Sequence, residues 1–119
     1  MNSKDQALTV ARALEDARAH DIAILEVSQI SGFADYFVIA TGTSTRHVRA
    51  LAEGAVEALE KSGCKRTGIE GLDACRWVLV DGFDVVVHLF LDEVRDFYDL
   101  ERLWDEAESV ALTPAAAVR

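Results

Sequence analysis

The chain has little cysteine and proline, no excess of basic residues and no long hydrophobic run. Its 119 residues include two cysteines, Cys64 and Cys75, and a single proline, Pro114. Two cysteines do not make a disulfide framework or a four-ligand zinc site. No apolar run approaches the roughly 20 residues of a membrane-spanning helix. Neither a secretory leader nor an Arg-rich, acid-poor transit segment opens the chain, so we expect a cytoplasmic protein.

The charge balance argues against a further class of protein, the nucleic-acid-binding domains. Acidic residues outnumber basic ones by 21 to 12, which gives a formal net charge of −9. Nucleic-acid binding needs a basic patch to neutralise phosphates, so a nucleic-acid-binding domain is not expected. Residues 92–108 alone hold eight acids and two bases. Such a segment is either a solvated helix face or a negative surface that attracts a basic protein.

The length and hydrophobic content predict one folded domain. Half of the residues are hydrophobic, and a chain of this size can bury a core. No internal repeat or linker divides the sequence. The end of the chain is of low complexity, with Thr113-Pro114 before three alanines. We therefore expect a domain over residues 1–108 and a flexible tail over residues 109–119.

Hydrophobic periodicity predicts eight elements in the order α-β-β-α-β-β-α-α. Apolar residues recur at helical spacing in the first segment, where Ser3 is a candidate N-cap. A second helix begins at Ser44 or Thr45 and ends before Gly63. The other elements are strands at 22–27, 35–41, 75–80 and 83–91 and helices at 4–19, 92–98 and 99–108, with loops at 28–34 and 64–74. The expected class is α/β or α+β, a mixed sheet with flanking helices.

The last two strands are predicted to form a hairpin. Asp81-Gly82 indicates a two-residue turn, which places Trp77 opposite Val86 and Leu79 opposite Asp84. Side chains alternate across a strand. One face then carries Cys75, Trp77, Leu79, Asp84, Val86, His88 and Phe90. The other carries Arg76, Val78, Val80, Phe83, Val85, Val87 and Leu89.

The two faces of this hairpin differ in chemistry. The second face is almost wholly aliphatic and is predicted to be core. The first mixes a tryptophan, a histidine and an aspartate with apolar residues, so we expect it to be half exposed. Aromatic and aliphatic residues rimmed by charge are typical of a protein-binding surface. The pattern equally allows Trp77 to fill a gap under a helix.

Candidate chemistry is concentrated in the segment 41–47. A glycine turn with hydroxyls and Arg46 lies between a strand and a helix, and helix N-termini bind phosphate. The segment has one glycine and no Walker lysine, so an ordinary capped helix start is the simpler interpretation. Asp81 and Asp84 are not the alternate-residue pair that would hold Mg²⁺ on one strand face. The three histidines share no metal-ligand spacing. We predict a non-enzyme with no metal and no cofactor.

Several motifs, in order, resemble the ribosomal silencing factor family, also called Iojap-like. They are Phe33 to Val48, Glu70-Gly71, Trp77 to Asp81, Asp84 to His88 and Glu93 to Trp104. The resemblance covers roughly residues 4–108. The chain departs from it at the hairpin, because the family places a glycine immediately before the aspartate that matches Asp84, where Gly82-Phe83 reverses the order.

The resemblance implies a nucleotidyltransferase-like fold without catalytic carboxylates. It also implies binding to the large ribosomal subunit through large-subunit ribosomal protein fourteen, which blocks small-subunit joining and represses translation when nutrients are limited. Free members are homodimers. Family contacts lie around the stretch that matches Trp77 to Asp81. We expect Trp77 to be the partner-binding anchor with Leu79 beside it, and Asp81, Asp84 or His88 to supply polar contacts.

Two other functions stay open at this point. One is a nucleotide-dependent transferase that uses Gly42, Ser44 and Arg46, against which the missing acid pair argues. The other is an assembly factor for the large subunit, which would share the binding site and act on immature particles.

Overall fold

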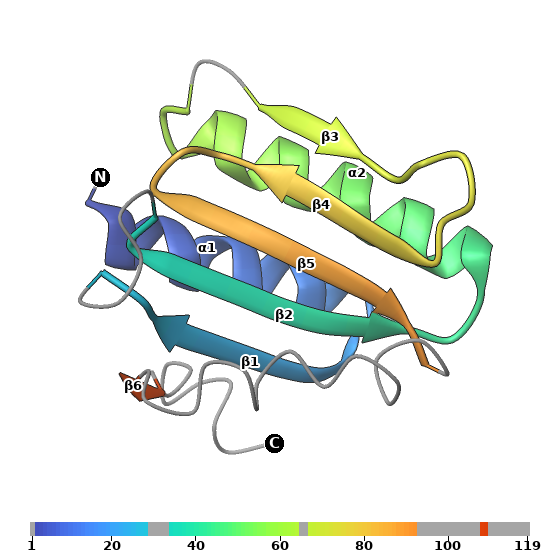
Figure 1. The fold of residues 1–119 in the computed structure, drawn as a ribbon. Helices are drawn as coiled ribbons and strands as arrows, with labels where there is room; N and C mark the ends of the chain where they lie inside the picture. The colour runs from blue at the N-terminus through green and yellow to red at the C-terminus, as the bar shows by residue number, and fades with distance from the viewer. Residues whose placement is uncertain (1, 29–33, 65–66, 93–107, 110–119) are drawn as a thin grey trace.

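The computed structural model describes residues 2–28, 34–64, 67–92 and 108–109. The elements are α1 (Ser3–Asp16), β1 (His20–Glu26), β2 (Tyr36–Gly42), α2 (Thr45–Lys61), β3 (Gly68–Glu70), β4 (Trp77–Asp81), β5 (Val85–Leu91) and β6 (Glu108–Ser109). The strands form one sheet in the order β3-β4-β5-β2-β1-β6 (Figure 1). β2 and β5 are parallel, whereas every other neighbouring pair is antiparallel. The predicted class, a mixed sheet with helices packed on it, is confirmed.

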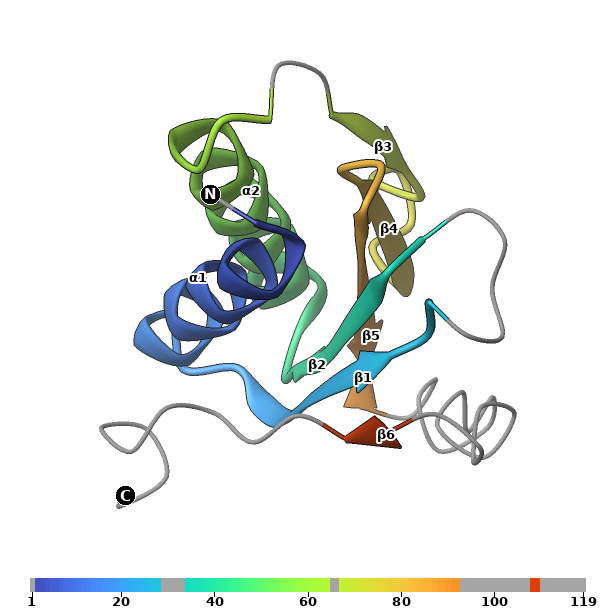
Figure 2. The same cartoon turned by 90° about the vertical axis from the view of Figure 1, so that its left-hand side faces the viewer.

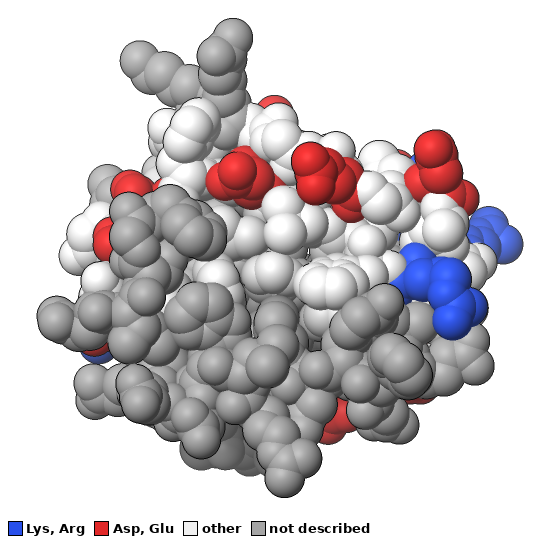
Figure 3. Space-filling view, in the orientation of Figure 1, with Lys and Arg blue, Asp and Glu red and all other residues white. Residues whose placement is uncertain are grey.

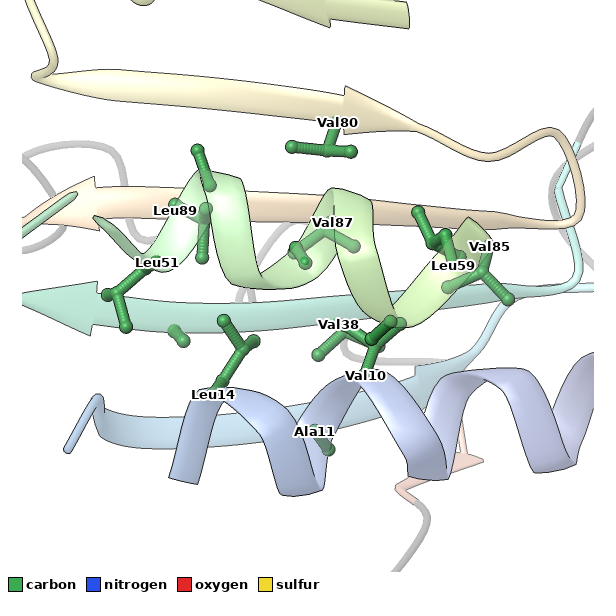
Figure 4. Close-up of a cluster of buried hydrophobic side chains, with 14 of the residues drawn as sticks. Val10, Ala11, Leu14, Val38, Leu51, Leu59, Val80, Val85, Val87 and Leu89 are labelled. Atoms are coloured by element: carbon green, nitrogen blue, oxygen red, sulfur yellow. The ribbon is translucent and has the colours of Figure 1, made fainter. Parts of the chain in front are cut away.

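Both helices pack on the same face of this sheet (Figure 2). Their apolar stripes and the inward side chains of β2, β4 and β5 form the larger core (Figure 4). Its fully buried members include Val10, Leu14, Val38, Leu51, Leu59, Val80, Val87 and Leu89. We call the opposite side of the sheet, which bears Trp77, Leu79, Val86, His88, Phe90, Phe37, Ile39 and Leu25, the outer face. A second apolar cluster lies there.

The two helices follow from local sequence signals. Of the two residues at which the second helix was predicted to begin, Ser44 is the cap of α2, because its Oγ accepts the N–H of His47 at 3.0 Å. Gly63 has a φ of +102° just beyond the helix, as expected of a C-terminal glycine. The predicted cap of α1 was wrong by one residue. Asn2 occupies that position, and its Oδ1 accepts the N–H of Asp5 at 2.8 Å. α1 also ends at Asp16, three residues earlier than predicted.

The hairpin register differs from the prediction. Trp77 lies opposite Phe90, and Leu79 lies opposite His88, four residues farther along β5 than expected. The N–H of Gly82 donates to Val85 O at 2.9 Å, so the turn residues are Phe83 and Asp84. A Cβ at Gly82 would lie 3.0 Å from both Leu59 methyls. Gly82 therefore packs against α2 just beyond β4, and the turn lies two residues later than predicted.

The even register shift preserves most of the predicted faces. The aliphatic set of β4 and β5 lies in the helix-side core, and Trp77 and Leu79 lie on the outer face. Two residues were wrongly assigned. Phe83, predicted to be core, is 61% exposed in the turn. Cys75, predicted to share the face of Trp77, is buried in the helix-side core, because its φ of +52° breaks the alternation before β4 begins.

The predicted elements omitted two short strands. β3 falls within residues 64–74, which were predicted to be loop. β6 pairs with β1 and includes Glu108, which was predicted to end a helix. Because β4 runs antiparallel to β5 and β5 runs parallel to β2, β4 is also antiparallel to β2. Of the helices predicted at 92–98 and 99–108, only Asp92 and Glu108 are among the described residues. Of the tail predicted at 109–119, only Ser109 is.

Candidate functional site

The outer face carries a cluster of aromatic side chains near the centre of the sheet. The ring centroids of Trp77 and Phe90 lie 4.9 Å apart across the β4–β5 pair, and Phe37 of β2 lies 4.8 Å from His88, edge to face. These distances are typical of aromatic pairs. β4 is the outermost of the three strands that meet here, and its two apolar outer-face side chains, Trp77 and Leu79, are half-buried.

The expectation of a half-exposed face is correct for β4 and wrong for β5. Phe90 is fully buried, and Val86 and His88 are each 6% exposed. β5 lies between β2 and β4, so strands flank it on both sides, whereas only short β3 lies beyond β4. The sequence pattern distinguished the two faces of the hairpin. It did not show that β5 lies in the interior of the sheet and β4 nearer its edge.

His88 is a buried polar group among aromatic rings. Its Nδ1 accepts the indole N–H of Trp77 at 3.3 Å. Burial lowers the pKa of His88 from its ordinary value of 6.5 to about 4, so the ring is neutral at neutral pH. Its Nε2 is buried and has no hydrogen-bond partner among the described residues. An unsatisfied buried donor costs about 1–3 kcal/mol.

The two candidate aspartates lie at the exposed hairpin turn. The Oδ1 of Asp81 accepts the backbone N–H of Phe83 at 2.8 Å, which stabilises a turn in which Phe83 has a φ of +70°. The carbonyl of Asp84 accepts the N–H groups of Asp35 and Tyr36, which ties the turn to the start of β2. Both carboxylates remain exposed. They lie at the far end of β4 from Trp77, whereas His88 is adjacent to it.

Acidic side chains gather along the edge formed by β3 and β4 (Figure 3). The exposed acids of this part of the molecule include Glu70, Asp73, Asp81 and Asp84. Basic side chains lie at the end where β4 begins, and Arg76 immediately precedes that strand. The half-buried pair Trp77 and Leu79 thus borders an edge that carries negative charge. Most of the acidic segment 92–108 lies outside the described residues.

The glycine turn between β2 and α2 uses its polar groups within the protein. His47 Nδ1 accepts the N–H of Thr43 at 3.0 Å, and Ser44 is occupied as the helix cap. A Cβ at Gly42 would lie 2.7 Å from Val48 Cγ2, so close packing accounts for the glycine. These contacts match an ordinary capped helix start. In the chain segments that are described, no group of three His, Cys, Asp or Glu residues could hold a metal ion.

Sequence reasoning missed two residues that position Trp77. Gly71 has a φ of +92°, and a Cβ there would lie 2.2 Å from the carbonyl oxygen of Trp77. Phe37 supports the imidazole that accepts the indole N–H. In the sequence, Gly71 stands out only as part of a family motif. The continuous apolar run of β2 does not indicate that Phe37 faces His88.

Comparisons with known proteins match most or all of the chain. A family model described as "Ribosomal silencing factor during starvation" matches residues 1–119. Ribosomal silencing factor RsfS of Bacillus subtilis (strain 168) is 43% identical over 107 residues, which cover 90% of this chain and 91% of that protein. Mitochondrial assembly of ribosomal large subunit protein 1 of Mus musculus is 40% identical over 94 residues, which cover 76% of this chain and 41% of that protein.

A solved structure also matches this chain in fold. A crystal structure of a Chromobacterium violaceum protein matches with a TM-score of 0.84 and 37% identity, over 95% of this chain and 93% of that one. Among the parts of the chain that the structure describes, no helix combines the length and the apolar character that crossing a membrane requires.

Proposed function

Because this chain belongs to the ribosomal silencing factor family, we propose that it represses translation by occupying the large ribosomal subunit. It binds large-subunit ribosomal protein fourteen and sterically blocks association with the small subunit when nutrients are limited. This mechanism requires a stable contact surface and no bond-making step. The protein therefore acts as a regulator rather than as an enzyme, with no cofactor and no direct sequence-specific contact to nucleic acid.

The observation that carries the proposal is the half-buried pair Trp77 and Leu79 on β4. Aromatic anchors of this kind contribute a large share of binding energy at protein interfaces. Trp77 packs on Phe90 and is hydrogen-bonded to His88, so its ring is already ordered before binding. Little side-chain entropy is then lost when a partner covers it.

The charge beside this pair supports a basic protein as the partner. Basic side chains including Arg76 lie at the Trp77 end of β4, whereas the exposed acids extend from Glu70, which pairs with Leu79, to Asp81 and Asp84 at the hairpin turn. The chain as a whole carries a net charge of −9. Negative potential repels the phosphates of ribosomal RNA and attracts Lys and Arg side chains. The same surface thus selects a ribosomal protein over the surrounding RNA.

The free protein is proposed to be a cytoplasmic homodimer. If dimerisation and ribosome binding both cover the apolar part of the outer face, the two compete. Apparent affinity for the subunit should then weaken as the protein concentration is raised through the range in which dimers form. A dimer that binds as tightly as the monomer would show that the two surfaces are separate.

Sedimentation with separated ribosomal subunits, followed by addition of small subunits, tests the function. We expect the protein to travel with the large subunit and to lower the yield of joined ribosomes. Binding to neither subunit would overturn the proposal, and the loop from Gly42 to Arg46 would then be titrated with nucleotides and Mg²⁺ by calorimetry.

A substitution tests the surface. Trp77→Ala should weaken binding to the large subunit by about 2–4 kcal/mol. Ile69→Ala is the matched control, because Ile69 is a 39% exposed aliphatic residue of the adjacent strand β3 that pairs with Val80 and not with the outer-face residues. A Trp77→Ala protein that remains folded in thermal unfolding and binds like the Ile69→Ala control would exclude Trp77 as the anchor.

The second candidate function is assembly of the large subunit. The relative from Mus musculus is named for assembly of the mitochondrial ribosomal large subunit, and this chain could act likewise on immature particles through the same surface. Binding to the large subunit without any effect on subunit joining would favour assembly over silencing.

A further inference from the structure

An imidazole occupies the centre of the outer face, at a position where its neighbours are apolar. His88 lies between Val86 and Phe90 along the outer face of β5, and its side chain is 6% exposed. Phe37 packs against it edge to face at 4.8 Å. Burying a polar ring is unfavourable unless its nitrogen atoms are hydrogen-bonded. The reason for a histidine here must therefore lie in what its ring contacts.

The hydrogen bond to Trp77 determines the tautomer of His88. An indole N–H can only donate, so the Nδ1 that receives it at 3.3 Å carries no proton. The proton of the neutral ring is consequently on Nε2. That atom is buried and has no partner among the described residues. His88 thus leaves one polar atom unsatisfied while it provides an acceptor for Trp77.

We propose that His88 is a positioning residue for Trp77, which it holds in the orientation that the partner recognises. Phe90 packs on the indole at 4.9 Å, and the Nδ1 of His88 receives its N–H. Together they restrict rotation of the Trp77 side chain. The inference rests on the proposed function, in which Trp77 anchors the protein to the large subunit.

This arrangement also restricts how a partner binds Trp77. The indole N–H is already engaged within the protein, so the partner need not supply an acceptor for it. Recognition then depends on the exposed part of the ring, which suits an aliphatic side chain or the cation of a Lys or Arg placed over the ring. Those residue types fit a basic protein partner.

Two substitutions at His88 separate the acceptor from the ring. His88→Phe keeps an aromatic ring and removes the acceptor. His88→Asn removes the ring and keeps an amide oxygen as far from Cα as Nδ1. We expect His88→Phe to weaken binding to purified large subunits roughly five- to tenfold, the effect of one hydrogen bond. Its melting temperature should change little, because loss of the unsatisfied Nε2 offsets loss of the hydrogen bond to Trp77. We expect His88→Asn to bind within about twofold of the unsubstituted chain.

A double-mutant cycle adds a test that does not depend on the size of either single effect. Trp77→Phe keeps an aromatic anchor without an N–H. In that background, His88→Phe should change affinity by less than about twofold, because no hydrogen bond remains to be lost. An equal loss in both backgrounds would show that His88 acts by packing alone, which would overturn the proposal.

The outcomes distinguish this inference from the proposed function. If His88→Phe binds like the unsubstituted chain while Trp77→Ala does not, the anchor stands and the positioning role of His88 fails. If the unsubstituted chain and Trp77→Ala both fail to discriminate large subunits from small ones, the proposed function itself fails. Weaker binding of His88→Asn than of His88→Phe would assign the effect to the ring and would likewise refute positioning by the hydrogen bond.

Discussion

His47 joins the beginning of α2 to the end of α1 through the backbone carbonyl of Ala17, 30 residues earlier in the chain. Its Nε2 lies 2.9 Å from that carbonyl oxygen, and its Nδ1 accepts the N–H of Thr43 at 3.0 Å. A backbone N–H can only donate, so Nδ1 is unprotonated and Nε2 donates to Ala17. One imidazole thus links the end of the first helix to the loop before the second.

The first prediction concerns this link. His47→Ala removes both hydrogen bonds and leaves the partners in Thr43 and Ala17 unpaired, so the free energy of unfolding should fall by about 1–2 kcal/mol. Urea unfolding measures the change. Arg46→Ala is the matched control, because Arg46 is an exposed residue of the same helical turn, and it should leave stability nearly unchanged. Equal effects of the two substitutions would contradict a linking role for His47.

The second prediction concerns pH. Burial holds the pKa of folded His88 at about 4, against 6.5 for the ordinary residue. Between these values the unfolded chain binds a proton that the folded chain excludes, so stability is complete above pH 6.5 and declines as pH falls toward 4. From pH 7 to pH 5 this one residue should lower the free energy of unfolding by about 2 kcal/mol.

The His88→Phe protein provides the comparison for that measurement. It retains His20, His47 and the carboxylates, so the difference between the two pH profiles isolates His88. Urea unfolding at pH 7 and pH 5 should show a steeper decline for the unsubstituted chain. Parallel profiles would mean that His88 is accessible to protons in the folded state.

The third prediction concerns the exposed hairpin turn. Phe83 has a φ of +70°, a left-handed conformation that costs a side chain about 1–2 kcal/mol and that glycine adopts freely. Phe83→Gly should therefore raise the free energy of unfolding by about 1 kcal/mol. Phe83→Ala removes the same exposed ring but keeps a Cβ, so it should give no such gain. A gain of the same size in both would assign the effect to the ring and not to the backbone.

The fourth prediction compares two glycines. Gly71 has a φ of +92°, and a Cβ there would lie 2.2 Å from the carbonyl oxygen of Trp77. Gly71→Ala should therefore destabilise the fold by more than about 2 kcal/mol and shift the fluorescence of Trp77. Gly54 lies within α2, where a Cβ would meet nothing within 4 Å. Gly54→Ala should stabilise the protein by about 0.5–1 kcal/mol, and a loss there would refute this account.

Helices α1 and α2, the long strands and the division of the hairpin into two faces were predictable from the sequence because they depend on local spacing. An apolar stripe every three or four residues predicts α2, and alternation with period two separates Val78 from Trp77. The cap at Ser44 and the glycine at 63 are equally local signals. The same alternation indicated Trp77 and Leu79 as candidate contacts, and the resemblance to a known family identified the same stretch.

Contacts between distant segments decided the rest. The hairpin turn lies at Phe83-Asp84, where the N–H of Gly82 donates to Val85 O and Gly82 packs closely against Leu59 of α2. β5 lies between β2 and β4 and is buried on both faces, an order and a burial that no local pattern contains. His88 is neutral, buried and bonded to Trp77 because pairing of β4 with β5 places the two side chains together. Sequence spacing determines which way a side chain points, whereas tertiary packing determines what it meets.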